Sequence, residues 1–137
     1  MAVQTTRFRV ETRGGTDIVN LTVRVAAHIQ KGPIRDGTVT LFVPGSTAGL
    51  TTTEYEPGVV ADLHEAWERL FPAEHPYRHN AIDDNGHSHV RAAFLGPSLS
   101  VPFTNRQLAL GTWQQIVLVD FDTHPRQREL ILQIVGD

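Results

Sequence analysis

The sequence predicts one compact α+β domain over residues 1–137, with mainly antiparallel β-sheets packed with two to three helices. The length of 137 residues is ordinary for a single domain. The first half of the chain mixes strand-like and helix-like patterns, whereas the last third is a run of strand patterns. Separation of strands from helices along a chain favours an antiparallel sheet over repeated βαβ units.

The first third of the chain is expected to hold two strands and a helix. Residues 5–11 alternate between apolar and charged side chains, which indicates a half-buried strand. Residues 17–19 form a short extended piece. A helix follows over residues 21–30, with Asn20 as its cap and Gly32 at its end.

The middle of the chain alternates strands and helices. Residues 38–43 are rich in β-branched and apolar side chains and predict a buried strand, which resumes over residues 50–53. The apolar spacing over residues 59–71 is helical. Residues 72–86 are polar and form the longest loop, and residues 89–95 are expected to be a short helix.

The last third predicts strands over residues 99–103, 107–110, 114–121 and 128–135. A small strand-rich domain must protect its exposed edges and faces. Burial between subunits is one way to do so.

The composition excludes several classes of function. A net charge of −3 and scattered arginines argue against a nucleic-acid binder. The absence of cysteine excludes disulfides and thiolate metal sites. No apolar run approaches the roughly 20 residues that span a membrane, and Met1 to Val10 carry no signal-peptide pattern. We expect a cytoplasmic protein without membrane or nucleic-acid partners.

The strongest candidate site is a histidine cluster formed by His79, His87 and His89, close to Asp83 and Asp84. Imidazoles suit zinc and similar ions, and carboxylates can complete the shell. In a strand, residues 87 and 89 point to the same side, whereas in a helix they lie about 200° apart. The alternatives are a solvated loop with capping roles and a histidine general acid or base.

Two other polar segments are candidates for ligand contacts. Ser46 and Thr47 follow Gly45 in a break between strands, where hydroxyls and backbone N–H groups can hold an anion. The alternative is an ordinary tight turn. Glu54 and Asp62 flank the start of a predicted helix and would serve as proton acceptor or magnesium ligand, or only as partners of the helix dipole.

Trp113 and Gln114 form a further candidate contact beside a glycine bend. An indole and an amide can stack on and hydrogen-bond to a flat ligand. The competing interpretation is that Trp113 is a core residue, as most tryptophans are.

The order of these motifs resembles the YjbQ-type family over nearly the whole chain, and the LGPS and LGTWQ strings are its most specific signals. The matching segments are Val43–Ala48, Tyr77–His79, Asn85–Ala92, Leu95–Leu99, Leu108–Ile116 and Asp120–Asp122. The resemblance implies a homotrimer of compact α+β domains. It also implies a secondary thiamin-phosphate synthase activity in some members. The family pattern further implies a metal or phosphate held by its motif histidines, and His79 and His89 match two of those positions.

The chain departs from the family pattern at three places. Gly45 stands where the pattern has its first histidine, and His87 adds an imidazole that many relatives lack. Thr123 and His124 stand where a glycine would precede Pro125. The third histidine of the site has therefore moved to position 87, or the site has lost its metal.

The leading hypothesis is an enzyme that acts on a phosphorylated metabolite. A divalent ion, zinc or magnesium, would be held by His79, His87 and His89, and no organic cofactor is expected. Glu54, His79 and His89 are the predicted catalytic residues. The predicted substrate-binding residues are Ser46, Thr47, Asp62, Trp113 and Gln114. The alternatives are a non-catalytic homotrimer that binds a metal or a phosphorylated metabolite, and a structural trimer whose pocket is vestigial.

Overall fold

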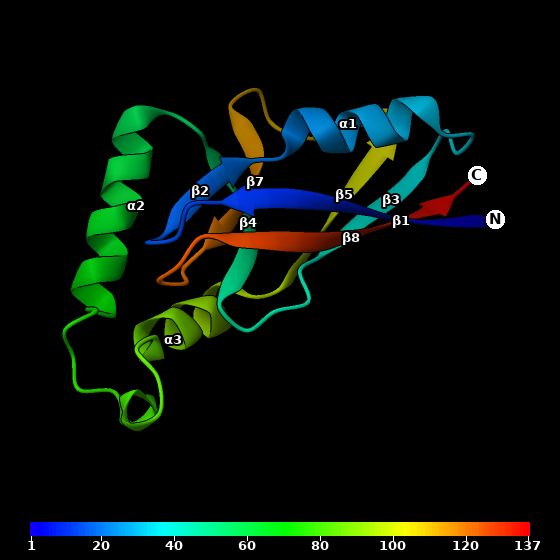
Figure 1. The fold of residues 1–137 in the computed structure, drawn as a ribbon. Helices are drawn as coiled ribbons and strands as arrows, with labels where there is room; N and C mark the ends of the chain where they lie inside the picture. Colours follow the sequence, from blue (N-terminus) through cyan, green and yellow to red (C-terminus); the bar gives the residue numbers. More distant parts are fainter.

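The fold, described for residues 1–137 by a computed structural model, has two antiparallel sheets and three α-helices (Figure 1). One sheet has five strands in the order β1-β8-β3-β5-β6, and the other has three in the order β2-β7-β4. Every strand pair is antiparallel. The predicted fold class is confirmed.

The five-stranded sheet is organised around the pairing of the two ends of the chain. Its strands are β1 (Ala2–Thr12), β8 (Arg126–Gly136), β3 (Gly37–Phe42), β5 (Ser98–Thr104) and β6 (Gln107–Leu108). Strands β1 and β8 pair along their full lengths, so the two termini lie side by side (Figure 1). Strand β6 is shorter than the predicted residues 107–110.

The three-stranded sheet positions the candidate site at one of its ends. It consists of β2 (Asp17–Asn20), β7 (Gln114–Asp120) and β4 (Ala48–Glu54). Ala48 lies opposite Asp120 and Glu54 lies opposite Gln114. At about 3.3 Å per residue, the two ends of β4 lie roughly 20 Å apart.

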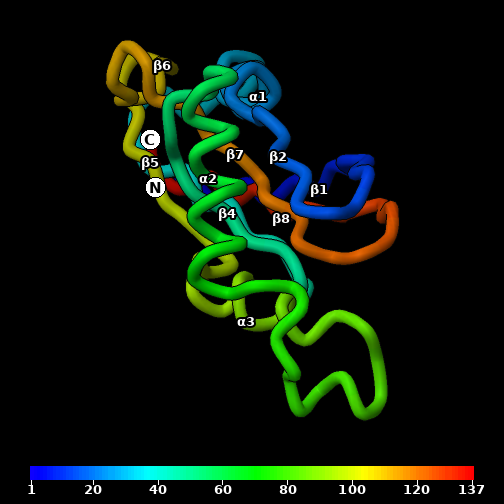
Figure 2. The backbone as a smooth tube through the Cα atoms, turned by 90° about the vertical axis from the view of Figure 1, so that its left-hand side faces the viewer, coloured from blue at the N-terminus to red at the C-terminus, as the bar shows by residue number.

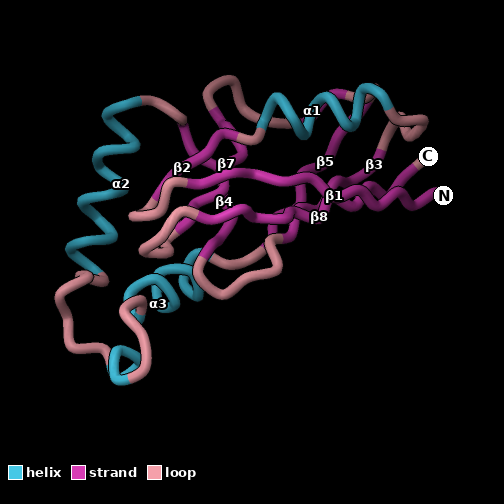
Figure 3. Tube along the Cα trace, viewed as in Figure 1, coloured by secondary structure: helices cyan, strands magenta, loops and turns pink.

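Helix α1 (Thr22–Lys31) covers the five-stranded sheet, and α2 (Pro57–Leu70) and α3 (Gly86–Leu95) lie beside the three-stranded sheet (Figure 2). The loop between α2 and α3 contains the 3₁₀ turn η1 (Arg78–Ala81) and projects away from the sheets (Figure 3). Helix α3 begins three residues earlier than predicted. No helix combines the length and the apolar character needed to cross a bilayer.

The core is divided in two by β7, whose central residues are buried on both faces. Alternate residues Ile116 and Leu118 belong to a cluster of 18 buried apolar residues beneath α1. Val117 and Val119 belong to a second cluster of 5, against which α2 packs. Because β7 is enclosed on both sides, the aspartate at its end is buried as well. This places an ionisable group where it must find partners inside the protein.

Candidate functional site

The start of α3 separates the predicted histidine triad into a pair and a single residue. Because α3 begins at Gly86, His87 and His89 are both helical and lie about 200° apart around its axis. The His89 ring packs edge-on against His79, with centroids 4.6 Å apart. His87 instead faces Tyr77, with centroids 6.4 Å apart. Of the three imidazoles expected to converge, His79 and His89 lie together and His87 points elsewhere.

Each member of the His79–His89 pair is oriented by one hydrogen bond. His79 Nε2 lies 3.1 Å from the side-chain oxygen of Asn85. His89 Nδ1 lies 3.1 Å from the backbone oxygen of Ser46. Since both partners are acceptors, each ring donates through that nitrogen, and its other nitrogen remains available to a ligand.

An open cavity of about 430 Å³ lies beside this pair. Its wall consists of the loop before α3 and the first turns of α3: His75, Pro76, Tyr77, Arg78, His79, Gly86, His89 and Val90. Four of these side chains carry ring or guanidinium nitrogens, and none is a carboxylate. We call this cavity the histidine pocket, and its lining suits an anionic ligand.

Gly86 allows the loop to pack closely against α3. A Cβ at this position would lie 2.5 Å from the Cβ of Tyr77 and 2.8 Å from the side-chain oxygen of Asn80. Its N–H donates to that same oxygen at 2.9 Å. A larger residue would displace the loop and with it one wall of the pocket.

His87 is held in a partly buried position beside α3. Burial lowers its pKa, and the nearby charge of Arg91 lowers it further. Its Nδ1 is sealed from solvent and has no hydrogen-bond partner. The structure contains no group of three or more His, Asp or Glu side chains placed to hold a metal. A divalent ion at His79, His87 and His89 stays a prediction, and this chain alone supplies two neighbouring ligands for it.

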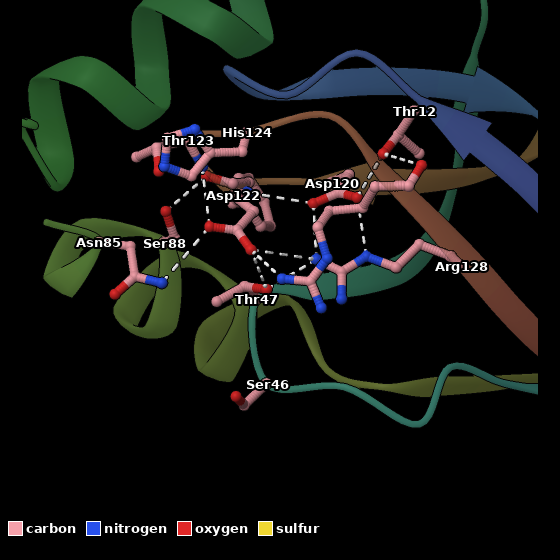
Figure 4. A network of polar contacts seen from close by, with 12 residues as sticks. Thr12, Ser46, Thr47, Asn85, Ser88, Asp120, Asp122, Thr123, His124 and Arg128 are labelled. Carbon is pink, nitrogen blue, oxygen red and sulfur yellow. Dashed lines mark hydrogen bonds and ion pairs between the residues drawn. The ribbon is translucent and has the colours of Figure 1, made fainter. Parts of the chain in front are cut away.

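A second polar cluster, the Arg128 network, joins the ends of β7 and β8 to the loop before β4 (Figure 4). Arg128 Nε and Nη2 donate to the two carboxylate oxygens of Asp120 at 2.7 and 2.8 Å. The Asp120 side chain is fully buried and that of Arg128 is 6% exposed. Thr12 donates to Asp120 at 2.6 Å, and Thr47 accepts from Arg128 Nη2 at 2.6 Å. The hydroxyl of Thr47 is thus engaged in this network.

Asp122 connects the network to the histidine pocket. One of its oxygens accepts from Arg126 at 2.6 Å, and the other accepts from the Asn85 amide at 3.3 Å. The same Asn85 holds His79 through its oxygen. Asn85 is the N-cap residue of α3, but its side chain makes no capping bond because both ends are used here.

The two aspartates of the network are charged. Burial alone would raise the pKa of Asp120, but hydrogen bonds from Arg128 and Thr12 outweigh it and keep the pKa below its ordinary value. For Asp122, burial is likewise outweighed by the N–H of Thr123 and the amide of Asn85, so its pKa is also lowered. Opposite charges and directed donors therefore hold the network together.

The remaining predicted site residues lie elsewhere. Glu54 and Gln114 are at the far end of β4 from the histidines, and Gln114 donates to Thr52 at 2.9 Å. Trp113, beside them, is 72% exposed, so it is not a core residue. Asp62 is exposed on α2. The structure brings Ser46 and Thr47 near the histidines and does not bring these four there.

Several residues of the site were missed by the sequence analysis. Arg128 is the clearest, because it occupies an inward position of β8 two residues before the buried Leu130. A charged residue in register with a strand's apolar face is a signal that could have identified it. His75 and Arg78 gave no such signal, because only the folded loop places them on one cavity.

The fold and site together define an antiparallel α+β protein with an imidazole-lined pocket. The profile of the family described as UPF0047 protein YjbQ-like matches residues 6–137. The chain is 33% identical over 136 residues to a UPF0047 protein of Methanothermobacter thermautotrophicus, covering 99% of this chain and 94% of that protein. The chain therefore belongs to the UPF0047 family of YjbQ-like proteins.

Solved structures of similar proteins have the same fold. A hypothetical protein from Aeropyrum pernix is 30% identical with a TM-score of 0.92, covering 98% of this chain and 99% of that one. A YbjQ-like protein of unknown function from Sulfolobus solfataricus is 29% identical with a TM-score of 0.91, covering 99% of this chain and 100% of that one.

Proposed function

We propose that the protein binds a phosphorylated small molecule in the histidine pocket. The observation that carries this proposal is the lining of the pocket, where His75, Arg78, His79 and His89 face one cavity without a carboxylate. Guanidinium N–H groups, and imidazole rings in their cationic form, donate charge-assisted hydrogen bonds to phosphate oxygens. The N-terminus of α3 adds favourable polarity, because helix N-termini carry partial positive charge.

The geometry favours binding over catalysis within one subunit. Glu54, the predicted proton acceptor, lies at the far end of β4, a strand whose two ends are about 20 Å apart. The first histidine of the family pattern is replaced by Gly45. A homotrimer, which the family resemblance implies, would be needed to bring Glu54 of a neighbouring subunit to the pocket. Binding itself needs neither a metal nor a second subunit.

Calorimetry with two phosphorylated probes tests the binding function. Wild-type protein is titrated with thiamin phosphate and with inorganic pyrophosphate, alongside the double variant His79→Ala/His89→Ala. Each lost charge-assisted hydrogen bond costs about 1.5–3 kcal/mol, so binding should weaken at least about tenfold. His64→Ala, a histidine on α2 outside the pocket, serves as the matched control and should bind like wild type. Wild-type binding by the double variant, or no saturable binding of either probe, would contradict the proposal.

The second candidate function is a weak thiamin-phosphate synthase activity. The family resemblance favours it, and a pocket for phosphorylated ligands is compatible with it. The protein is incubated with the aminopyrimidine diphosphate, the thiazole phosphate and magnesium, and thiamin phosphate is measured. Product that disappears in His79→Ala supports the transferase. Saturable binding without product supports a non-catalytic binding protein.

A further inference from the structure

One amino group of Arg128 is left outside the Arg128 network. A guanidinium has five N–H groups. Nε and Nη2 donate to Asp120 and Thr47, whereas Nη1 donates to no group of the protein. The Arg128 side chain is 6% exposed. Nη1 is nevertheless not sealed from solvent, because the one sealed side-chain polar atom that lacks a partner is His87 Nδ1. Nη1 therefore keeps an opening to solvent although the rest of Arg128 is enclosed.

The opening lies at Gly45, in the turn between β3 and β4. A Cβ built on Gly45 would lie 3.0 Å from Nη1 and 4.0 Å from Cζ of Arg128. Gly45 itself is exposed. A side chain at this position would stand directly over the guanidinium, so the glycine keeps Nη1 accessible.

The surrounding turn supplies further donors. The backbone N–H groups of Gly45, Ser46 and Thr47 make no hydrogen bond within the protein. The Ser46 side chain points away from the network (Figure 4), so its amide is the group of interest. Arg128 Nη1 and these three backbone amides are therefore uncommitted N–H donors close together in the chain fold, which suits a ligand that accepts hydrogen bonds.

The charges around Nη1 cancel one another, so a ligand would be recognised by hydrogen-bond geometry more than by net charge. Asp120 and Asp122 offset Arg126 and Arg128, so the network carries no formal net charge. Long-range attraction is therefore weak, and recognition depends on donors at fixed positions. Arg128 is fixed by its two bonds to Asp120, so its free edge is already oriented before a ligand arrives.

We propose that Arg128 Nη1 and the backbone N–H groups of residues 45–47 form a binding site for a tetrahedral oxyanion of the phosphate type, kept open by Gly45. None of these residues lines the histidine pocket. The turn still touches that pocket, because Ser46 O holds His89 at 3.1 Å and a smaller cavity is lined by Gly45, Ser46 and His89. The site uses donors of its own, so its binding of phosphate is measured separately from the function proposed above.

A phosphate titration followed by backbone amide NMR tests this site. Inorganic phosphate should shift the amide resonances of Gly45, Ser46 and Thr47 in the wild type and equally in His79→Ala. Gly45→Ala should weaken this response at least about tenfold, which corresponds to about 1.4 kcal/mol. Gly111→Ala is the matched control, because a Cβ there meets only ordinary contacts of 3.6 Å or more.

A second variant tests whether the guanidinium group itself is needed or only its positive charge. Arg128→Lys retains a cation for Asp120 but lacks the forked Nη1 edge, so it should also lose the phosphate response. If Arg128→Lys fails to fold, Gly45→Ala decides the question, and its melting temperature verifies that it is folded. Unchanged phosphate binding in Gly45→Ala would overturn the proposal. So would a response at residues 45–47 that disappears in His79→Ala.

Discussion

The histidine pocket and the Arg128 network meet at Asn85, but they use their polar groups in opposite ways. In the network, the buried carboxylate of Asp120 receives bonds from Arg128, Thr12 and the backbone of Asp122. In the pocket, His79 and His89 each make one bond and retain a free ring nitrogen. Saturated groups stabilise a fold, whereas unsaturated groups beside a cavity are available to a ligand. The bonds around Asp120 are therefore structural, whereas the free ring nitrogens of the pocket, and Arg128 Nη1 at the edge of the network, are available to a ligand.

The largest expected effect comes from removing Asp120. The variant Asp120→Ala removes the two-bond partner of the buried Arg128 guanidinium and leaves it a longer approach to Asp122 at 3.9 Å. Breaking a buried ion pair costs about 3–5 kcal/mol. This is a large share of the roughly 5–15 kcal/mol stability of an ordinary domain. Urea unfolding measures the change. A loss below about 1 kcal/mol would show that the network is not the structural cluster described here.

The next effect concerns Gly86, which lies in the wall of the histidine pocket. Gly86→Ala forces a Cβ to within 2.5 Å of Tyr77, and overpacking of this kind costs about 1–3 kcal/mol. The displaced loop should also impair binding of phosphorylated probes in the histidine pocket. Gly111→Ala again provides the control, with stability and binding close to wild type. Wild-type stability in Gly86→Ala would show that the loop does not need the close contact.

A smaller effect is expected from pH. Burial lowers the pKa of His87 from 6.5, so below about pH 6.5 the unfolded chain binds a proton that the folded chain resists. The contribution of His87 to the free energy of unfolding should be fully present above about pH 6.5 and should be lost as the pH falls from there toward the lowered pKa of the folded protein. The pKa of His28 is lowered by burial in the same way, and Lys31 adds to the shift.

The variant His87→Gln isolates the contribution of this residue. Unfolding curves at pH 7 and about pH 5.5 should differ less for this variant than for the wild type, and the remaining difference should include that of His28. An identical pH dependence in both proteins would contradict the assignment of His87 as a buried neutral histidine.

The smallest effect is expected at the far end of β4. Glu54→Gln should leave the binding of phosphorylated probes unchanged, because Glu54 does not line the pocket and lies at the far end of β4 within one subunit. Its stability should change by less than about 0.5 kcal/mol, since the residue is exposed. Weakened binding in this variant would indicate that a neighbouring subunit brings Glu54 to the site.

The fold was largely predictable because local patterns and tertiary packing agree. Alternation in residues 5–11 and the helical spacing of residues 59–71 correspond to β1 and α2. The sequence pattern predicts the start of α3 at residue 89, whereas the helix begins at Gly86, and this difference decides where His87 points. Gly86 is a poor helix former, and its helical conformation depends on packing against Tyr77 and Asn80, which the sequence does not reveal.

The site was predictable only where its residues are neighbours in the sequence. His79 and His89 were identified as a cluster, and the structure brings them together. Arg128 and Asp120 were missed, because their pairing depends on how the five-stranded and three-stranded sheets meet. Glu54, Trp113 and Gln114 were assigned to the same site, but β4 places them at its opposite end. Sequence motifs identify residues of interest, whereas strand direction decides which of them meet.

NMR of the seven histidine side chains during titration with thiamin phosphate tests the central claim most directly. The ring resonances of His75, His79 and His89 should shift and saturate together, while those of His28 and His64 stay in place. Unmoved resonances at His79 and His89, or equal shifts at all seven histidines, would contradict a phosphate-binding histidine pocket.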